Sequence, residues 1–343
     1  MALPALRFFV GIIKALIFLG FLSISAIAGG LWWYAHEPIR IADAGVDFTV
    51  PQGASMRATA RLAAQSMPVY ADVLVLIARI KGRDTQIKAG SYDIEPGTSP
   101  LALIDKLTRG DVTMQELSIP EGWTFRQFRQ ALDAHESVNH ASRGVDDRAL
   151  MAQIVKLEGG ELRHPEGLFF PDTYLFAKGA RDIDILRRAY RAMNRRMAAE
   201  WERRAPGLPY ASVYEALIMA SIVEKETGQA KERPQIAGVF VNRLRKGMLL
   251  QTDPTVIYGL GEAFDGNLRK RDLQIDTPYN TYTRAGLPPG PIALPGLAAL
   301  QAALKPARTE ALFFVARGDG SHEFSATLEA HNRAVNRYQR RGG

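Results

Sequence analysis

The first pattern along the chain is an apolar segment near the N-terminus that contains no charged residue. Residues 15–34 read ALIFLGFLSISAIAGGLWWY, which is 20 residues. A helix of about 20 apolar residues spans the hydrocarbon core of a bilayer. The run closes on Trp32, Trp33 and Tyr34, and aromatic side chains concentrate where lipid meets water. The segment therefore predicts a transmembrane helix over 15–34.

Charges on either side of this segment predict its orientation. Arg7 and Lys14 precede it, whereas residues 36–43 are mixed in charge. The positive-inside rule places residues 1–14 in the cytoplasm and the rest of the chain on the other side of the membrane. A cleaved signal peptide is the competing interpretation, because residues 26–28 (Ala-Ile-Ala) resemble a cleavage site. The anchor is favoured because the apolar run continues beyond these residues.

Residues 46–132 then show a repeated strand–turn–helix pattern. Its three copies cover 46–63, 92–107 and 117–132. Each begins with alternating apolar residues, as a half-buried strand does, and continues through a turn rich in Pro and Gly. A small polar residue follows that can cap the next helix by accepting a backbone N–H bond. These predicted caps are Ser55, Ser99 and Thr124.

The first two copies enclose a further helical pattern over 68–82. The order strand–helix–helix–strand predicts a small α+β module over 45–115. This order resembles a LysM-like module, which implies binding to glycans that contain N-acetylglucosamine. A plain packing module that positions the rest of the chain is the alternative.

The remaining chain alternates helical patterns with dense loops. Residues 116–150 are predicted to form a connecting strand and helix, followed by a polar loop or hinge over 133–150. Residues 151–340 are predicted to form a larger mixed α/β domain, with helices over 181–204 and 211–227. The fold class is therefore α+β: one transmembrane helix, a small module and a larger domain.

The helix over 211–227 carries the first candidate for chemistry. Its residues 216–223 are almost wholly apolar, so the helix is predicted to be buried and to end with Gly228 as its C-cap. Glu224 and Glu226 emerge from this apolar run. Desolvation raises the pKa of a carboxyl group toward the value that a general acid needs. Bulkier apolar neighbours favour Glu226 as that group, and Glu224 is expected to pair with a cation or orient a loop. Two ordinary surface glutamates are the alternative.

Three loops are unusually rich in Tyr, Thr, Asn, Gly and Pro. They cover 165–176, 251–261 and 276–296. Such loops suit a ligand covered with hydroxyl and amide groups, such as a sugar, and their prolines preorganise the polar groups. Rigid turns between helices are the structural alternative.

Composition narrows the possible chemistry. The 343 residues carry a formal net charge of +7 and contain no cysteine, which excludes disulfides, a thiol nucleophile and cysteine-ligated metals. His164, His322 and His331 are far apart in sequence, and His135 and His140 lie in a polar loop, so none shows metal-ligand spacing. We expect no metal or cofactor. The net positive charge favours an anionic partner such as anionic lipid or an acidic glycan. The cations are dispersed and the domain is exported, which argues against a nucleic-acid partner.

Four segments together resemble the endolytic murein transglycosylase family. They are ASIVEKET (220–227), VFVNRLRKGMLLQTDPTVIYGLG (239–261), YNTYTRAGLPPGPIALPG (279–296) and LFFVARGDGSHEFSATLEAHNRAV (312–335). The order and spacing of these segments match those of the family, and the segment PEGLFFPDTY (165–174) also fits. The resemblance runs from the anchor to the C-terminus.

The resemblance implies an enzyme of the bacterial inner membrane with its catalytic domain in the periplasm. It would cut nascent peptidoglycan between N-acetylmuramic acid and N-acetylglucosamine and leave 1,6-anhydromuramoyl ends. The family's catalytic glutamate falls on Glu226, with Glu224 as the fallback. Expected partners are the glycan strands, membrane lipid and peptidoglycan synthases. The residues expected to position the sugars are Gln251, Thr252, Asp253, Tyr258, Tyr279, Asn280 and Tyr282.

Two other functions remain open at this point. A hydrolytic muramidase would need a second carboxylate, with Asp172 or Asp253 as candidates. A non-catalytic, membrane-anchored glycan-binding protein would keep the module and would not depend on Glu226.

Overall fold

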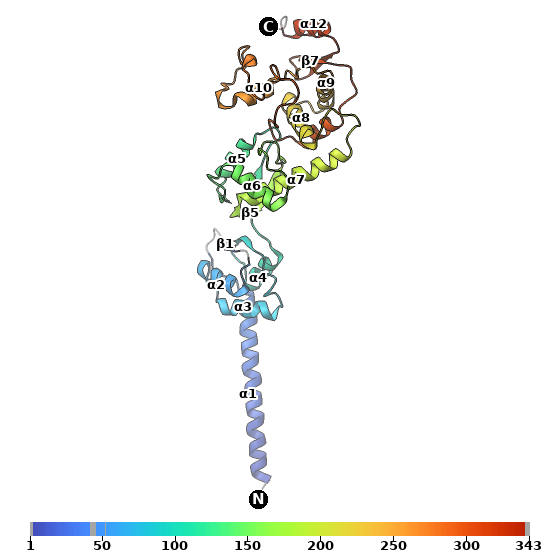
Figure 1. Ribbon diagram of the computed structural model, residues 1–343. Coiled ribbons are helices and arrows are strands. Elements are labelled where there is room, and N and C mark those ends of the chain that lie inside the picture. Colours follow the sequence, from blue (N-terminus) through green and yellow to red (C-terminus); the bar gives the residue numbers. More distant parts are fainter. Residues whose placement is uncertain (1–2, 42–45, 52, 340–343) are drawn as a thin grey trace. The chain divides into compact units, whose positions relative to one another are not determined.

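The computed structural model describes residues 3–41, 46–51 and 53–339 and divides into two compact units (Figure 1). Unit 1 comprises Met1–Gln115 with Phe176–Gly179, and unit 2 comprises Glu116–Leu175 with Ala180–Gly343. The chain therefore leaves unit 1, returns to it for four residues and then completes unit 2.

The N-terminal apolar segment forms one long helix, α1 (Leu3–His36). Its part Leu16–His36 is long and apolar enough to cross a membrane, and the most apolar 18-residue window of it is not buried inside the protein. The last turns of α1 behave differently, because Ala35 and the following Ile39 are buried in the core of unit 1 and Tyr34 packs against that core.

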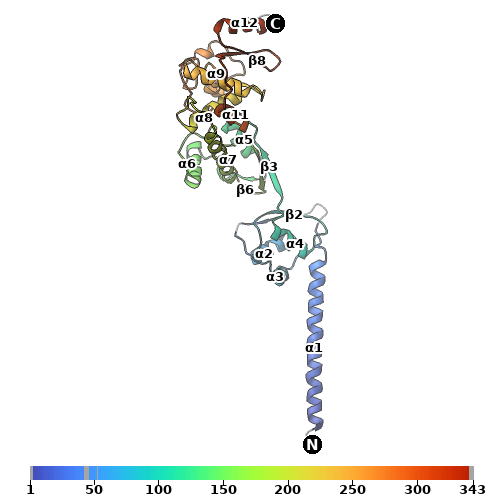
Figure 2. The ribbon, with the colours of Figure 1, turned by 90° about the vertical axis from the view of Figure 1, so that its right-hand side faces the viewer.

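Unit 1 has the order that the sequence predicts. Strand β1 (Val46–Val50) is followed by helices α2 (Met56–Ser66) and α3 (Ala71–Ile80), and then by β2 (Gly90–Ile94) and α4 (Pro100–Arg109). The strands β1 and β2 pair antiparallel, so that Phe48 lies opposite Tyr92. Both of these side chains are buried, and with the apolar faces of the three helices they form one core. Figure 2 shows α2, α3 and α4 gathered on one side of β2.

The three predicted helix caps are confirmed. Each side-chain oxygen accepts a backbone N–H from the first turn of its helix, which satisfies a donor that the helix leaves unpaired. The bonds run from Ala58 to Ser55, from Ala102 to Ser99, and from Gln127 to Thr124.

The third copy of the repeat departs from the first two. Its strand β3 (Met114–Ser118) pairs with β5 (Thr173–Ala177) and not with β1 or β2. Its helix α5 (Phe125–Ala134) belongs to unit 2. The repeat thus specifies local structure only, because strand pairing depends on which distant segments share a core.

The prediction of a loop over 133–150 is partly wrong. This polar segment contains the short strand β4 (Val138–Asn139), which pairs parallel with β6 (Ala180–Arg181). It also contains the start of α6 (Asp147–Glu158), whose N-cap Asp146 accepts two backbone N–H bonds. The signal for this start was present in Asp146, a residue type that favours N-caps.

The rest of unit 2 is mainly helical and encloses α8 (Val213–Glu226), which packs against α7 (Asp182–Glu202), α9 (Arg233–Arg245), α10 (Asp253–Leu260) and α11 (Leu297–Leu304). Two 3₁₀ turns, Gly261–Ala263 and Asp272–Gln274, follow α10. The chain ends in the antiparallel hairpin of β7 (Phe313–Ala316) and β8 (His322–Ser325), against which α12 (Leu328–Tyr338) packs.

An aromatic cluster joins α5 to the loop that precedes β5. Phe169 is fully buried, and its ring lies 4.8 Å from that of Phe125 and 6.1 Å from that of Phe128. We expect Phe169→Ala to lower the free energy of unfolding by about 3–5 kcal/mol, because truncation leaves a cavity. Urea denaturation of the full chain in detergent, followed by circular dichroism, measures this loss. The half-exposed Leu175 is the matched control, and an equal loss in Leu175→Ala would contradict the prediction.

Candidate active site

Glu226 stands at the end of a helix that the fold buries almost completely. Residues 216–224 of α8 are all buried, which confirms the predicted buried helix. The predicted C-cap is wrong, because α8 ends at Glu226 and the cap is Thr227, in an extended conformation with φ −147°. Glu226 therefore lies at the point where the helix leaves the core.

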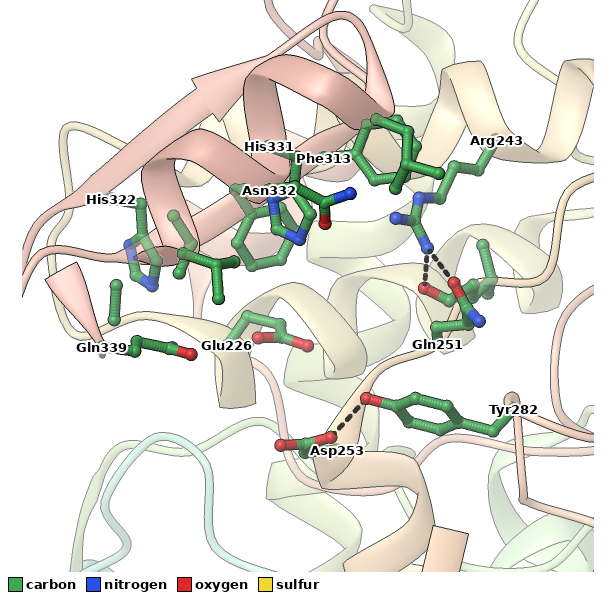
Figure 3. Close-up of a pocket in the computed structure, with 16 residues that line it drawn as sticks. Glu226, Arg243, Gln251, Asp253, Tyr282, Phe313, His322, His331, Asn332 and Gln339 are labelled. Atoms are coloured by element: carbon green, nitrogen blue, oxygen red, sulfur yellow. Dashed lines mark hydrogen bonds between the residues drawn. The ribbon is translucent and has the colours of Figure 1, made fainter. Parts of the chain in front are cut away.

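A cavity of about 530 Å³ opens at this helix end (Figure 3). Glu226 lies on one side of it, with Asp253 and Tyr282 below and the β7–α12 segment above in the view of Figure 3. The residues that line the cavity are Glu226, Arg243, Leu250, Gln251, Asp253, Tyr282, Phe313, Phe314, Val315, Ala316, His322, Leu328, His331, Asn332, Val335 and Gln339.

The carboxyl group of Glu226 has the protonation behaviour of a general acid. Burial, together with the nearby charge of Asp253, raises the pKa of Glu226 from 4.5 to about 7. The hydroxyl of Thr252 donates a hydrogen bond to Oε1, which favours the ionised form and opposes the rise, as does the positive charge of Arg243. Near neutral pH this carboxyl group can both give and take a proton.

The loop that carries Thr252 is held by a buried arginine. Arg243 donates from Nη1 to the carbonyl oxygens of Leu249 (3.1 Å) and Leu250 (2.9 Å), and from Nε to Leu312 (2.6 Å). One side chain thus ties α9 to the loop on one side and to the segment before β7 on the other. Arg243 was not anticipated from the sequence, where it is one cation among many.

Gln251, Thr252 and Asp253 point alternately out of and into the protein. Gln251 is exposed and has a φ of 52°, the only positive φ of a non-glycine residue in the described chain. Thr252 is buried, and Asp253 is exposed at the cavity. A backbone conformation of this kind is maintained only where surrounding bonds enforce it; here the Gln251 N–H donates to the carbonyl of Thr281 (3.1 Å).

The segment around residue 280 supports this loop. The Tyr282 hydroxyl donates to Asp253 Oδ1 at 2.6 Å, and both residues line the cavity. Asn280 is fully buried; its amide donates to the carbonyls of Leu273 and Ile275, and its Oδ1 accepts the N–H of Tyr282. Asn280 therefore shapes the backbone beneath Tyr282, and its side chain does not reach the cavity.

Tyr258 lies at a second cavity, of about 650 Å³, and not at the first. Its hydroxyl donates to Glu166 Oε2 (3.1 Å), and its ring packs edge-on against Tyr279 at 4.8 Å. Glu166 is buried and also accepts the Phe125 N–H (2.9 Å); burial raises its pKa to about 7. Lys225 also lines this cavity, so the two cavities adjoin consecutive residues at the end of α8.

Glu166 is a site residue that the sequence reasoning missed. It stands between Pro165 and Gly167 in a loop already marked as dense in aromatic residues. A carboxylate is unusual among buried loop residues, but burial is not visible in a loop without periodicity.

Glu224 is confirmed as the residue that pairs with a cation and orients a loop. Its Oε1 accepts from Arg233 Nη2 at 3.2 Å, and its Oε2 accepts the Gly296 N–H at 2.9 Å. Both side chains of the ion pair are buried. Glu224 thus anchors the loop before α11 and faces away from the cavity that Glu226 lines.

The wall opposite Glu226 comes from the last 30 residues, which sequence reasoning did not single out for the site. His331 and Asn332 of α12 line the cavity, as does His322 of β8 (Figure 3). His322 bonds Glu232 through Nδ1 at 2.7 Å. The His331 ring stacks on Phe313 at 5.2 Å; burial lowers its pKa, and its Nδ1 has no hydrogen-bond partner among the described residues.

No three His, Cys, Asp or Glu side chains of the described ranges are grouped so that they could hold a metal ion.

The model of the YceG-like family matches residues 48–337, which is most of the chain and includes every residue that lines the cavity except Gln339. The chain belongs to the YceG-like family. Two curated relatives bear the name endolytic murein transglycosylase. The one from Bacillus subtilis is 33% identical over 331 residues, and the alignment covers 91% of both chains. The one from Streptococcus pneumoniae is 28% identical and covers 94% of this chain but 64% of the relative.

A solved structure agrees with the architecture of this YceG-like protein. The 2.6 Å crystal structure of a YceG-like protein from Listeria monocytogenes superposes with a TM-score of 0.55 at 31% identity. It covers 85% of this chain and 99% of the Listeria chain. The family match and the fold therefore agree.

Glu224 offers a stability test that separates it from its neighbour. Glu224→Ala removes one partner of a buried ion pair and leaves the Gly296 N–H unsatisfied. We expect a loss of roughly 3 kcal/mol in the free energy of unfolding. Glu226→Ala is the matched control, because removing a desolvated carboxyl group relieves a cost, and we expect it to keep or raise stability. Thermal unfolding of both variants measures the difference, and equal losses would refute the assigned roles.

Proposed function

We propose that this YceG-like protein is an endolytic murein transglycosylase with Glu226 as its catalytic acid and base. The relatives that bear this name support the reaction. The observation that carries the residue assignment is the position of Glu226: a single carboxyl group at the end of a buried helix, in a cavity, with a pKa of about 7.

The reaction needs one carboxyl group used twice. Protonated Glu226 gives its proton to the glycosidic oxygen as the bond from that oxygen to C1 of N-acetylmuramic acid breaks. The carboxylate then takes the proton of the C6 hydroxyl while the C6 oxygen bonds to C1. Glu226 ends protonated, no water is consumed, and a 1,6-anhydro ring remains. A group with a pKa near the working pH suits both steps.

A hydrolase would need a second carboxylate that activates water. Of the two candidates, Asp172 does not line the cavity of Glu226 and lies 3.5 Å from Arg196. Asp253 does line it, but its Oδ1 accepts the Tyr282 hydroxyl and its charge raises the pKa of Glu226. This arrangement supports the lytic route, with Asp253 helping to keep the proton on Glu226.

The sugar-binding roles follow from where the side chains lie. Gln251, Asp253 and Tyr282 line the cavity with exposed or half-exposed polar groups, and we assign them to the sugars beside the cut bond. His331, whose Nδ1 has no hydrogen-bond partner in the part of the chain that the structure describes, is assigned to the opposite wall. Tyr258 lines the second cavity, which we assign to sugars farther along the strand, and Tyr279 supports it through the contact between the two rings.

Location and organisation are part of the same proposal. α1 serves as a retained single-pass anchor of the inner membrane, with residues 1–14 in the cytoplasm and the catalytic domain, residues 151–340, in the periplasm. The aromatic end of its apolar run supports this. Residues 45–115 act as a LysM-like module, supported by their strand–helix–helix–strand order, and residues 116–150 connect it to the catalytic domain. Peptidoglycan synthases are its expected partners, because the enzyme would act on nascent glycan strands.

Glu226→Gln tests the central assignment. Uncrosslinked glycan strands are incubated with the full chain in detergent, and product masses are read by mass spectrometry. We expect anhydro-ended products from the wild type and a loss of at least about 100-fold in the variant, because the amide can neither give nor take the proton.

The exposed Glu202→Gln of α7 is the control and should keep full activity. Products heavier by one water would identify a hydrolase, and unchanged release of glycan by Glu226→Gln would refute the role of Glu226. If no glycan is released by any form, the non-catalytic binding function replaces this proposal.

The dependence of the reaction rate on pH gives a second test, because two variants should displace it in opposite directions. The reaction starts from protonated Glu226, so the rate should fall as pH rises through about 7. Thr252→Val removes a hydrogen bond that favours the carboxylate, so the falling limb should move to higher pH. Asp253→Asn removes a like charge, so the same limb should move to lower pH.

Initial rates between pH 5 and pH 9 measure these limbs, and roughly one pH unit of displacement corresponds to about 1.4 kcal/mol. A limb that stays in place in both variants would show that another group controls the profile. Glu202→Gln should leave the limb unchanged.

A further inference from the structure

Helix α3 presents an apolar face that unit 1 does not cover. Leu76 and Ile80 have the spacing that places residues on one side of a helix. Leu76 is 47% exposed and Ile80 is 63% exposed, whereas Leu74 and Ile77 on the other side are buried. Tyr70, immediately before the helix, is 71% exposed. The face defined by Tyr70, Leu76 and Ile80 is hereafter the α3 face.

The α3 face begins where the apolar segment of α1 ends. The Tyr34 hydroxyl accepts the backbone N–H of Tyr70 at 2.9 Å, and the two rings lie 5.8 Å apart. Tyr34 is also the last residue of the aromatic group that closes the apolar run. Tyr70 is therefore placed at the depth that interfacial aromatic residues occupy.

The end of α1 is part of the core of unit 1. Ala35 and Ile39 belong to the buried core, and Leu31 and Tyr34 pack against it. The Ile39 N–H donates to the carbonyl of Thr98 at 2.9 Å. These contacts hold the end of α1 against unit 1, so the depth of α1 in a bilayer would set the depth of α3.

Both ribbon views place α3 on the side of unit 1 from which α1 emerges (Figures 1 and 2). The β1–β2 sheet lies on the opposite side of the unit in the same views. The apolar α3 face therefore belongs to the side of unit 1 from which the candidate membrane span extends.

We propose that the α3 face docks onto the lipid surface and lies in the interface of the bilayer that α1 crosses. The inference rests on the proposed retention of α1 as a membrane anchor. Aliphatic side chains on one helix face, a tyrosine at its start and nearby cations that can extend to headgroups are the composition of an interfacial helix. Arg79 and Lys81 supply those exposed cations.

Docking fixes more than the depth of the helix. A single span can tilt and rotate in a bilayer, and its orientation is set by the groups anchored at the interface. The α3 face provides a second line of contact beside α1, so unit 1 is held in one orientation on the membrane. This role does not require the module to bind glycan.

The absence of cysteine in the sequence allows a clean test. Single cysteines are introduced at Leu76, Ile80, Ile24 and Thr49 of the full chain, labelled with the fluorophore NBD and reconstituted into phosphatidylethanolamine–phosphatidylglycerol vesicles. Lipids with a spin label near the headgroup then report proximity by quenching. We expect several-fold stronger quenching at Leu76 and Ile80 than at Thr49, which is exposed on the β1–β2 sheet.

Ile24 lies within the candidate span and separates the two hypotheses. A label at Ile24 that is shielded by lipid, with labels at Leu76 and Ile80 as accessible to water as that at Thr49, would overturn the docking and leave the anchor intact. A water-accessible label at Ile24 would overturn the anchor and the docking together.

A second variant checks that lipid contact depends on the apolar face. Leu76→Glu is combined with the label at Ile80; the position is half-exposed, so the fold should tolerate it. A charge in the interface opposes docking, and we expect the quenching at Ile80 to fall to the level of Thr49. Quenching that persists in this variant would show that the helix is not held by the α3 face.

Discussion

The burial of α8 is the constraint on which the rest of unit 2 depends. Nine consecutive residues of this helix are buried, so helices must cover it on several sides, and α7, α9, α10 and α11 do so. A helix enclosed in this way has one exit for a polar side chain, which is its end. Glu226 stands there, and the same enclosure that stabilises the fold desolvates its carboxyl group. The burial of α8 thus both stabilises unit 2 and raises the pKa of Glu226.

The two glutamates of this helix end show how two residues of one type acquire different properties. Glu224 faces Arg233 and the Gly296 N–H, and its buried charge is compensated by both. Glu226 meets a hydroxyl donor and a neighbouring carboxylate in a cavity, and its charge is compensated only in part. A separation of two residues turns the side chains by about 200° around the helix axis. Glu224 therefore stabilises a loop, whereas Glu226 has a pKa of about 7 and can exchange its proton near neutral pH.

The site is built from segments whose ends are held by backbone hydrogen bonds. Arg243 binds three carbonyl oxygens from two separate segments, and Asn280 closes the turn beneath Tyr282. Such side chains hold the segments around the cavity in place before a ligand binds, which lowers the entropy lost on binding. In unit 1 packing has a similar effect, because the end of α1 is part of the core of that unit.

The sequence by itself determined the local features: the long apolar helix, the capped helices after Ser55, Ser99 and Thr124, the buried helix and the candidate Glu226. Each rests on a pattern within a few turns of chain, such as a run of apolar residues or a cap, and such patterns act through neighbours in sequence. Only the tertiary structure decided that the third repeat pairs β3 with β5, that Asn280 is buried, that Glu166 is desolvated and that α12 closes the cavity. These depend on contacts between segments up to about a hundred residues apart, whose pairing is set by the shared core and leaves no local pattern to read.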